Sequence, residues 1–173
     1  MTVAAVVLAA GAATRFGSSK QSLLLPDVLA RVRKAGLHEL VVVTGAHRVK
    51  TDAPTVRCPQ WELGPGVSLR CGLDTLSPAA EAALVLLADG PDLASAAIDR
   101  VIAVWRRERE PLVAASYGGV RGHPLLLARE AWGDVPDEGL RAATPLLVPC
   151  DDLGSPGDVD RPSDLPQRFR QES

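Results

Sequence analysis

Aromatic side chains are scarce in this sequence: its 173 residues include three Trp, two Phe and one Tyr. Proteins that bind single-stranded nucleic acid by base stacking depend on such side chains. An excess of positive charge is lacking as well, because 19 basic residues stand against 21 acidic ones and the formal net charge is -2. A DNA-binding protein needs a broad basic surface. We therefore expect no nucleic-acid partner.

Long apolar runs are also lacking. The apolar stretches, for example residues 82–88, are far shorter than the roughly 18 residues that span a bilayer, and no basic segment of the secretory type precedes the first one. Cysteine is rare, with Cys58, Cys71 and Cys150 as its three positions. Their spacing matches neither a disulfide framework nor a CxxC metal site. We interpret all three as buried or incidental thiols of a cytoplasmic protein that has no membrane partner.

The sequence does contain an alternation of apolar runs and amphipathic segments. Four short apolar runs suit strands that are buried on both faces; they are residues 3–8, 40–44, 83–88 and 112–115. Helical spacing of apolar residues marks three segments, which are residues 26–35, 67–76 and 98–105, with Ser95 as a candidate N-cap of the last. This alternation predicts an α/β fold with a mostly parallel sheet. We expect one domain over residues 1–173, with less regular structure from Gly118 onward.

A turn of small residues follows the first predicted strand. It reads LAAGAATRFGSSK from Leu8 to Lys20. Small residues let a backbone approach a ligand closely, and the N–H groups of such a turn can bind an anion. Arg15 can donate two hydrogen bonds to phosphate oxygens, and Lys20 supplies a compact positive charge. The pattern matches neither GxGxxG nor GxxxxGK[ST], which disfavours a dinucleotide dehydrogenase and a P-loop kinase; a tight connection with two solvated cations is the alternative.

This turn is similar to the LAAGxxxRxGxxK signature of nucleotidyltransferases. Seven positions agree in residue type and spacing: Leu8, Ala9, Ala10, Gly11, Arg15, Gly17 and Lys20. Among these enzymes the chain most resembles the MobA-like family, and within it the MocA-type molybdenum cofactor cytidylyltransferases. The resemblance implies a three-layer fold with Rossmann-like nucleotidyltransferase topology. It also implies that residues 8–11 bind the nucleotide together with Arg15 and Lys20, the two catalytic cations. The LAAG start favours CTP, because LAGG is common in GTP-using members.

An acidic residue directly follows the predicted strand 83–88. Asp89 stands where the ligand crevice of an open α/β sheet lies, and Mg²⁺ usually takes one or two protein carboxylates. The family carries a metal-binding Asp in a similar LLxDxP motif, which implies that Asp89 binds Mg²⁺. Asp92 lies in the same turn, and we interpret it as a residue that supports the turn and caps the helix that follows.

A second acidic segment lies near the end of the chain. Residues 157–165 are similar to the DxDTPEDL close of the family, which implies that Asp160 completes the metal site, with Asp158 as the alternative. The same segment also reads as an acidic turn that enters a last helix, with Pro162 near its start and Ser163 as a cap.

The segment 58–73 resembles the NPxWxxGxxxSLxxGL element of the family. The resemblance implies that Gly64, Gly66 and Ser68 contact the nucleotide. Taken alone, Ser68 reads equally well as the N-cap of a helix.

The segment 118–127 is similar to the GxxGHPVLF segment of the family. This similarity implies that His123 lines the pocket of the second, pterin-bearing substrate and that Arg121 binds the phosphate of that substrate. We assign no general-base role to His123, because a phosphate monoester is mostly ionised near neutral pH. A solvated surface position is the alternative for Arg121.

These features predict a Mg²⁺-dependent enzyme that transfers CMP from CTP to the phosphate of molybdopterin; a sugar phosphate or another alcohol phosphate is the alternative acceptor. One departure from the family stands out. Members usually insert a GxPLL-type hairpin between the signature lysine and the first helix, whereas here Lys20 leads directly to the helix predicted at Pro26. The departure motivates a second hypothesis, a catalytically weak protein that delivers the finished cofactor to a molybdenum hydroxylase apo-enzyme.

Overall fold

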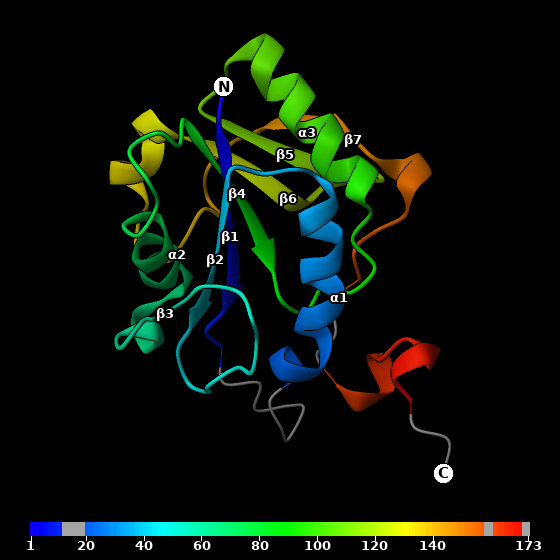
Figure 1. The fold of residues 1–173 in the computed structure, drawn as a ribbon. Helices are drawn as coiled ribbons and strands as arrows, with labels where there is room; N and C mark the ends of the chain where they lie inside the picture. The colour runs from blue at the N-terminus through cyan, green and yellow to red at the C-terminus, as the bar shows by residue number, and fades with distance from the viewer. Residues whose placement is uncertain (12–19, 158–160, 171–173) are drawn as a thin grey trace.

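The computed structural model describes residues 1–11, 20–157 and 161–170, and within them it has one sheet of seven strands. The strand order is β3-β2-β1-β4-β6-β5-β7 (Figure 1). The strands are β1 (Val3–Ala9), β2 (Glu39–Thr44), β3 (Thr55–Arg57), β4 (Ala82–Leu87), β5 (Leu112–Tyr117), β6 (Val120–Ala128) and β7 (Leu146–Pro149). Four neighbouring pairs run parallel, whereas β6 runs antiparallel to both of its neighbours. The predicted mostly parallel sheet is confirmed.

Helices cover both faces of the sheet and give three layers (Figure 1). Helices α1 (Lys20–Lys34) and α3 (Ser95–Glu108) pack on one face, and α2 (Pro65–Leu73) packs on the other. Short 3₁₀ turns join the described elements: η1 (Trp61–Leu63), η2 (Arg129–Asp134), η3 (Asp151–Leu153), η4 (Pro162–Asp164) and η5 (Gln167–Phe169). No helix in the described part of the chain is long and apolar enough to cross a membrane.

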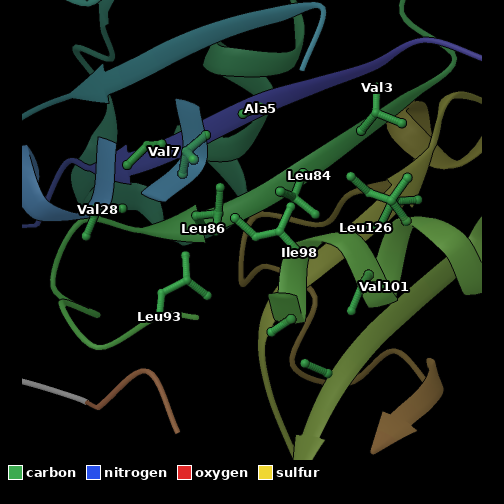
Figure 2. Packing of buried hydrophobic residues seen from close by; sticks show 14 of the residues in the cluster. Val3, Ala5, Val7, Val28, Leu84, Leu86, Leu93, Ile98, Val101 and Leu126 are labelled. Carbon is green, nitrogen blue, oxygen red and sulfur yellow. The ribbon is translucent and has the colours of Figure 1, made fainter. Parts of the chain in front are cut away.

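The core consists of two apolar layers, one on each face of the sheet. Val7, Leu86 and Ile98 belong to the layer under α1 and α3 (Figure 2). Val6 and Leu73 belong to the layer under α2. Because successive side chains of a strand point to opposite faces, a strand that is covered on both faces is apolar throughout. This is why continuous apolar runs identified the central strands correctly.

Helix α3 follows the apolar stripe that its sequence predicts. The buried stripe comprises Ile98, Val101, Ile102 and Trp105. The expected N-cap is wrong by one position, because Ala94 is the N-cap and Ser95 is the first helical residue. The Ser95 hydroxyl donates instead to the carbonyl oxygen of Arg31 at 3.2 Å. Ser95 therefore links α3 to α1.

Helix α1 begins at Lys20, six positions before the predicted start at Pro26. The prediction relied on the preference of proline for the first turn of a helix. Pro26 instead lies inside α1 on its exposed side. Leu25 is buried in the core, and Leu24 is buried against Leu165 and Phe169 of the C-terminal segment. The early start leaves no room for a hairpin after the signature lysine. Lys20 is consequently the first residue of the helix.

The chain beyond Gly118 is more regular than predicted. Gly118 and Gly119 have φ angles of 59° and 75°, which glycine adopts without strain. They form the two-residue turn of a hairpin in which Tyr117 of β5 pairs with Val120 of β6. Residues 120–128, where less regular structure was expected, therefore form the strand β6. The last predicted helix is also absent from the described residues, where two 3₁₀ turns stand in its place, and the N-cap of the first of them, η4, is Arg161.

Cys58 and Cys71 form a disulfide, so their interpretation as free thiols is wrong. Their Cα atoms lie 5.8 Å apart, a separation typical of disulfides. The fold brings them together because Cys58 follows β3 and Cys71 lies on α2, which contacts that strand. A spacing of 13 residues in sequence carries no information about this contact. Cys150 is free and buried, as expected.

Candidate active site

The carboxyl ends of β1 and β4 lie side by side, and both predicted ligand loops begin there. The two strands pair in parallel, and the Ala88 N–H donates to the carbonyl oxygen of Leu8 at 3.0 Å. Ala9 and Ala10 are buried, whereas Gly11 is exposed. The residues predicted to bind the nucleotide thus run from inside the sheet to its open edge.

Lys20 and Asp89 meet at this edge in an ion pair. The Nζ atom of Lys20 lies 2.9 Å from Oδ2 of Asp89, with the lysine side chain 7% and the carboxylate 22% exposed. Limited contact with water strengthens the attraction between the two charges. The structure therefore joins two residues that were predicted from separate motifs. Asp89 is partly exposed and lies outside the apolar core clusters.

Gln21 is a polar residue of this site that the sequence prediction overlooked. Its side chain is buried, and its Nε2 donates to the carbonyl oxygen of Gly11 at 3.2 Å. Its Oε1 is buried as well and meets no donor among the described residues. The available signal was a polar residue directly after Lys20, in a helix whose later buried positions are all leucine or valine.

The loop that carries Asp89 is held from outside by the end of the chain. The Asp92 N–H donates to the carbonyl oxygen of Pro156 at 2.9 Å. Arg168 donates to the Asp92 carboxylate at 2.9 Å and to the carbonyl oxygen of Pro91 at 3.1 Å. Arg168 also pairs with Asp27 of α1 at 3.0 Å. Asp92 therefore supports the turn, as predicted, and does not cap α3.

His123 lies at the same edge of the sheet, on β6. Because β6 runs antiparallel to β4, the start of β6 adjoins the carboxyl end of β4. Burial, assisted by the charge of Arg121, lowers the pKa of His123 to about 4, while the Asp89 carboxylate acts in the opposite direction. The imidazole is therefore neutral at pH 7. The Tyr117 hydroxyl donates to the His123 carbonyl oxygen at 2.8 Å, and Arg121 donates to that of Ala143 at 2.8 Å.

The sequence model of the MobA-like NTP transferase domain matches residues 5–144. The chain belongs to this MobA-like family. It is 29% identical to nicotine blue oxidoreductase from Paenarthrobacter nicotinovorans, over 86% of this chain and 78% of that protein.

Solved structures show the same fold. A homologue of Mycobacterium tuberculosis Rv0371c from Mycobacterium sp. strain JC1 is similar at a TM-score of 0.78 and 26% identity, covering 94% of this chain and 92% of that one. Rv0371c of Mycobacterium tuberculosis H37Rv in complex with manganese is similar at a TM-score of 0.72 and 25% identity, covering 95% and 96%. Family and fold place this MobA-like chain among the nucleotidyltransferases, as its glycine turn implied.

The MobA-like site offers one described carboxylate, that of Asp89, to a divalent cation. Among the described residues, no group of three or more His, Cys, Asp or Glu side chains could hold a metal by itself. Mg²⁺ needs only one or two carboxylates when water and substrate phosphates complete its shell, so Asp89 fits this cation. Arg15, Asp158 and Asp160 lie outside the described residues, and the roles of Arg15 and Asp160 stay predictions.

Two of the three glycines in the MobA-like segment 58–73, Gly64 and Gly66, are required by packing against backbone. A Cβ atom on Gly66 would overlap the carbonyl oxygen of Pro136, and one on Gly64 would overlap that of Asp137. The Gly66 N–H also donates to the Asp137 carbonyl oxygen at 2.9 Å. Ser68 is buried inside α2, whose N-cap is Gly64, so the N-cap alternative for Ser68 is wrong. The predicted contacts of these three residues to a nucleotide stay predictions.

Proposed function

We propose that this chain is a cytidylyltransferase, which transfers CMP from CTP to the phosphate of a molybdopterin-type substrate and releases pyrophosphate. The observation that best supports the proposal is the Lys20–Asp89 pair beside the Gly11 turn. A cation and a carboxylate at one point of a crevice suit a triphosphate and the divalent cation that accompanies it. The LAAG form of the turn supports CTP.

In the proposed reaction, an oxygen of the acceptor phosphate forms a bond to the α-phosphorus of CTP. The bond from that phosphorus to the bridging oxygen breaks, and its electron pair leaves with pyrophosphate. No proton has to be removed, because the acceptor phosphate is ionised near neutral pH. The chain's task is therefore to align the two phosphates and to neutralise charge, and Lys20 and Arg15 would perform the neutralisation.

Asp89, with Asp160 as the second predicted ligand, would hold Mg²⁺ at the crevice edge. Mg²⁺, when bound, neutralises charge on the triphosphate and on the leaving pyrophosphate. Lys20 balances the Asp89 carboxylate at 2.9 Å. We infer that Lys20 turns from this carboxylate toward the phosphates when the nucleotide and its cation enter.

His123 and Arg121 would line the acceptor side. A neutral imidazole presents one donor and one acceptor, which suits the polar ring of a pterin better than a phosphate. Arg121 keeps donors beyond the one bound to Ala143, and these would bind the acceptor phosphate.

The carrier hypothesis is the second candidate, and the start of α1 favours it. Because the helix begins at Lys20, the chain lacks the hairpin that members of the family usually place next to the nucleotide pocket. A chain without this hairpin would bind the finished cofactor with little turnover.

The deciding assay measures pyrophosphate released from CTP, Mg²⁺ and molybdopterin by the purified chain, with a sugar phosphate as a parallel acceptor. Because one relative is named an oxidoreductase, the assay has to measure nucleotidyl transfer itself. We expect Asp89→Asn to lower the rate at least about 100-fold. Asp99→Asn removes an exposed carboxylate on α3 and should leave the rate unchanged.

Equal rates for the wild type and Asp89→Asn would contradict the enzyme proposal. Cofactor binding without pyrophosphate release would instead select the carrier, and release with the sugar phosphate alone would replace the proposed acceptor.

A further inference from the structure

Gln21, beside the turn at Gly11, has a buried side-chain oxygen without a hydrogen-bond donor among the described residues. The residue is 5% exposed, and its Nε2 donates to the carbonyl oxygen of Gly11 at 3.2 Å. This bond determines the orientation of the carboxamide, because a carbonyl can only accept and the NH₂ group must face it. The Oε1 atom is consequently turned away from Gly11. It meets no donor in the part of the chain that the structure describes.

A buried acceptor without a donor is unfavourable, and such groups in native proteins have a reason. Gln21 lies in the first turn of α1, next to Lys20 and in contact with the exposed end of the turn at Gly11. The triphosphate cannot satisfy Oε1, because phosphate oxygens are acceptors too. The atom needs a donor, and the nucleoside part of a nucleotide carries donors.

We propose that Oε1 of Gln21 accepts a hydrogen bond from a donor on the nucleoside of the incoming nucleotide, either the exocyclic amino group of the base or a ribose hydroxyl. This inference rests on the proposed function. Gln21 is then a specificity-determining residue of the site. Because Oε1 is already desolvated, the donor that reaches it forms a full hydrogen bond without further loss of water from the acceptor.

Two analogues of CTP, each lacking one of the two kinds of donor, distinguish the two sources. UTP replaces the amino group of CTP with an acceptor oxygen, and 2′,3′-dideoxy-CTP lacks both ribose hydroxyls. The measurement is the dissociation constant of each nucleotide with Mg²⁺ by calorimetry, which needs no acceptor substrate and no turnover. We expect one of the two analogues to bind the wild type about tenfold more weakly than CTP because of this hydrogen bond.

Two variants separate the oxygen from the nitrogen of the carboxamide. Gln21→Met keeps the length of the side chain but has no comparable acceptor, so the preference for CTP over that analogue should fall about tenfold. Gln21→Glu keeps an acceptor oxygen but cannot donate to Gly11. It should retain the preference, even where its affinity for all three nucleotides is lower.

A purely structural role of Gln21 would give a different pattern of affinities, because such a role depends only on the hydrogen bond to Gly11. Both variants would then weaken all three nucleotides by similar factors and leave the preferences unchanged, which would overturn the inference alone. Failure of the wild type to bind any of the three would overturn the proposed function, and this inference with it.

Discussion

At the scale of single residues, His123 links the site to pH. Its pKa is about 4 in the folded chain because of burial and of Arg121, and about 6.5 when unfolded. Above pH 6.5 both states are neutral, and the stability is fully present. As the pH falls from 6.5 toward 4, the unfolded chain binds the proton first, so stability is lost.

We therefore expect the free energy of unfolding to fall by about 2–3 kcal/mol between pH 7 and pH 4 through this group. Urea denaturation at several pH values measures it, and His123→Gln is the reference because carboxylates titrate in the same range. Identical pH profiles for the wild type and His123→Gln would contradict the assigned environment.

Gly66 is a second position where one neighbour decides the residue type. Any Cβ atom there overlaps the carbonyl oxygen of Pro136, so one of the two segments has to move. We expect Gly66→Ala to lower the free energy of unfolding by about 1–3 kcal/mol. Gly133→Ala is the matched control, because a Cβ atom at Gly133 meets nothing within 4 Å. Chemical denaturation of both variants tests this difference, and equal losses would argue against the close approach.

At the scale of elements, Arg168 connects the two parts that bring Lys20 and Asp89 together. It pairs with Asp27 on α1 at 3.0 Å and with Asp92 in the Asp89 loop at 2.9 Å. Exposed ion pairs contribute little to stability, so the effect of this residue should appear in the geometry of the site.

We expect Arg168→Met to lower the free energy of unfolding by under about 1 kcal/mol and to weaken Mg²⁺-dependent nucleotide binding severalfold. Calorimetric titration with CTP and Mg²⁺ gives the second quantity. Arg107→Met breaks a local pair with the adjacent Glu108 and serves as the control. A loss of stability without a loss of affinity would show that the C-terminal segment does not position the Asp89 loop.

Helices and strands were predicted correctly where the pattern of apolar residues along the sequence alone determines the conformation. The central strands and the stripe of α3 are of this kind, since burial on both faces or on one face dictates the periodicity. The start of α1 was missed because tertiary burial of Leu24 and Leu25 outweighs the preference of Pro26. The hairpin at Gly118 and Gly119 had a local signal, a Gly-Gly turn between apolar runs, which was overlooked.

At the scale of the whole molecule, two apolar layers share one sheet, and we expect them to unfold together. Trp105 reports on the layer under α1 and α3, whereas Trp61 and Trp132 pack against the other layer. Trp105→Phe leaves the tryptophans of one layer as the fluorescent probe, and the double variant Trp61→Phe/Trp132→Phe leaves that of the other. In each variant, the urea midpoint measured by fluorescence should equal the midpoint measured by circular dichroism. Separate midpoints for the two signals within one variant would contradict the expectation of a single domain.

The sequence predicted individual residues of the candidate site but not the contacts between them. The residue types at Lys20 and Asp89 carry their chemistry in the sequence, because a signature turn and an acidic strand end are local patterns. Gln21 and the Cys58–Cys71 disulfide escaped prediction, because each depends on what a distant segment places beside it.

The sequence by itself determined the α/β fold, the family and the charged groups of the crevice, since these depend on periodicity and on short motifs. Only the tertiary structure decided that Lys20 neutralises Asp89, that His123 is neutral, and that the glycines at positions 64 and 66 make room for residues 136–139. The physical reason is distance. Ion pairing, desolvation and steric exclusion act over a few ångströms in space, and the order of strands in the sheet sets which residues come that close.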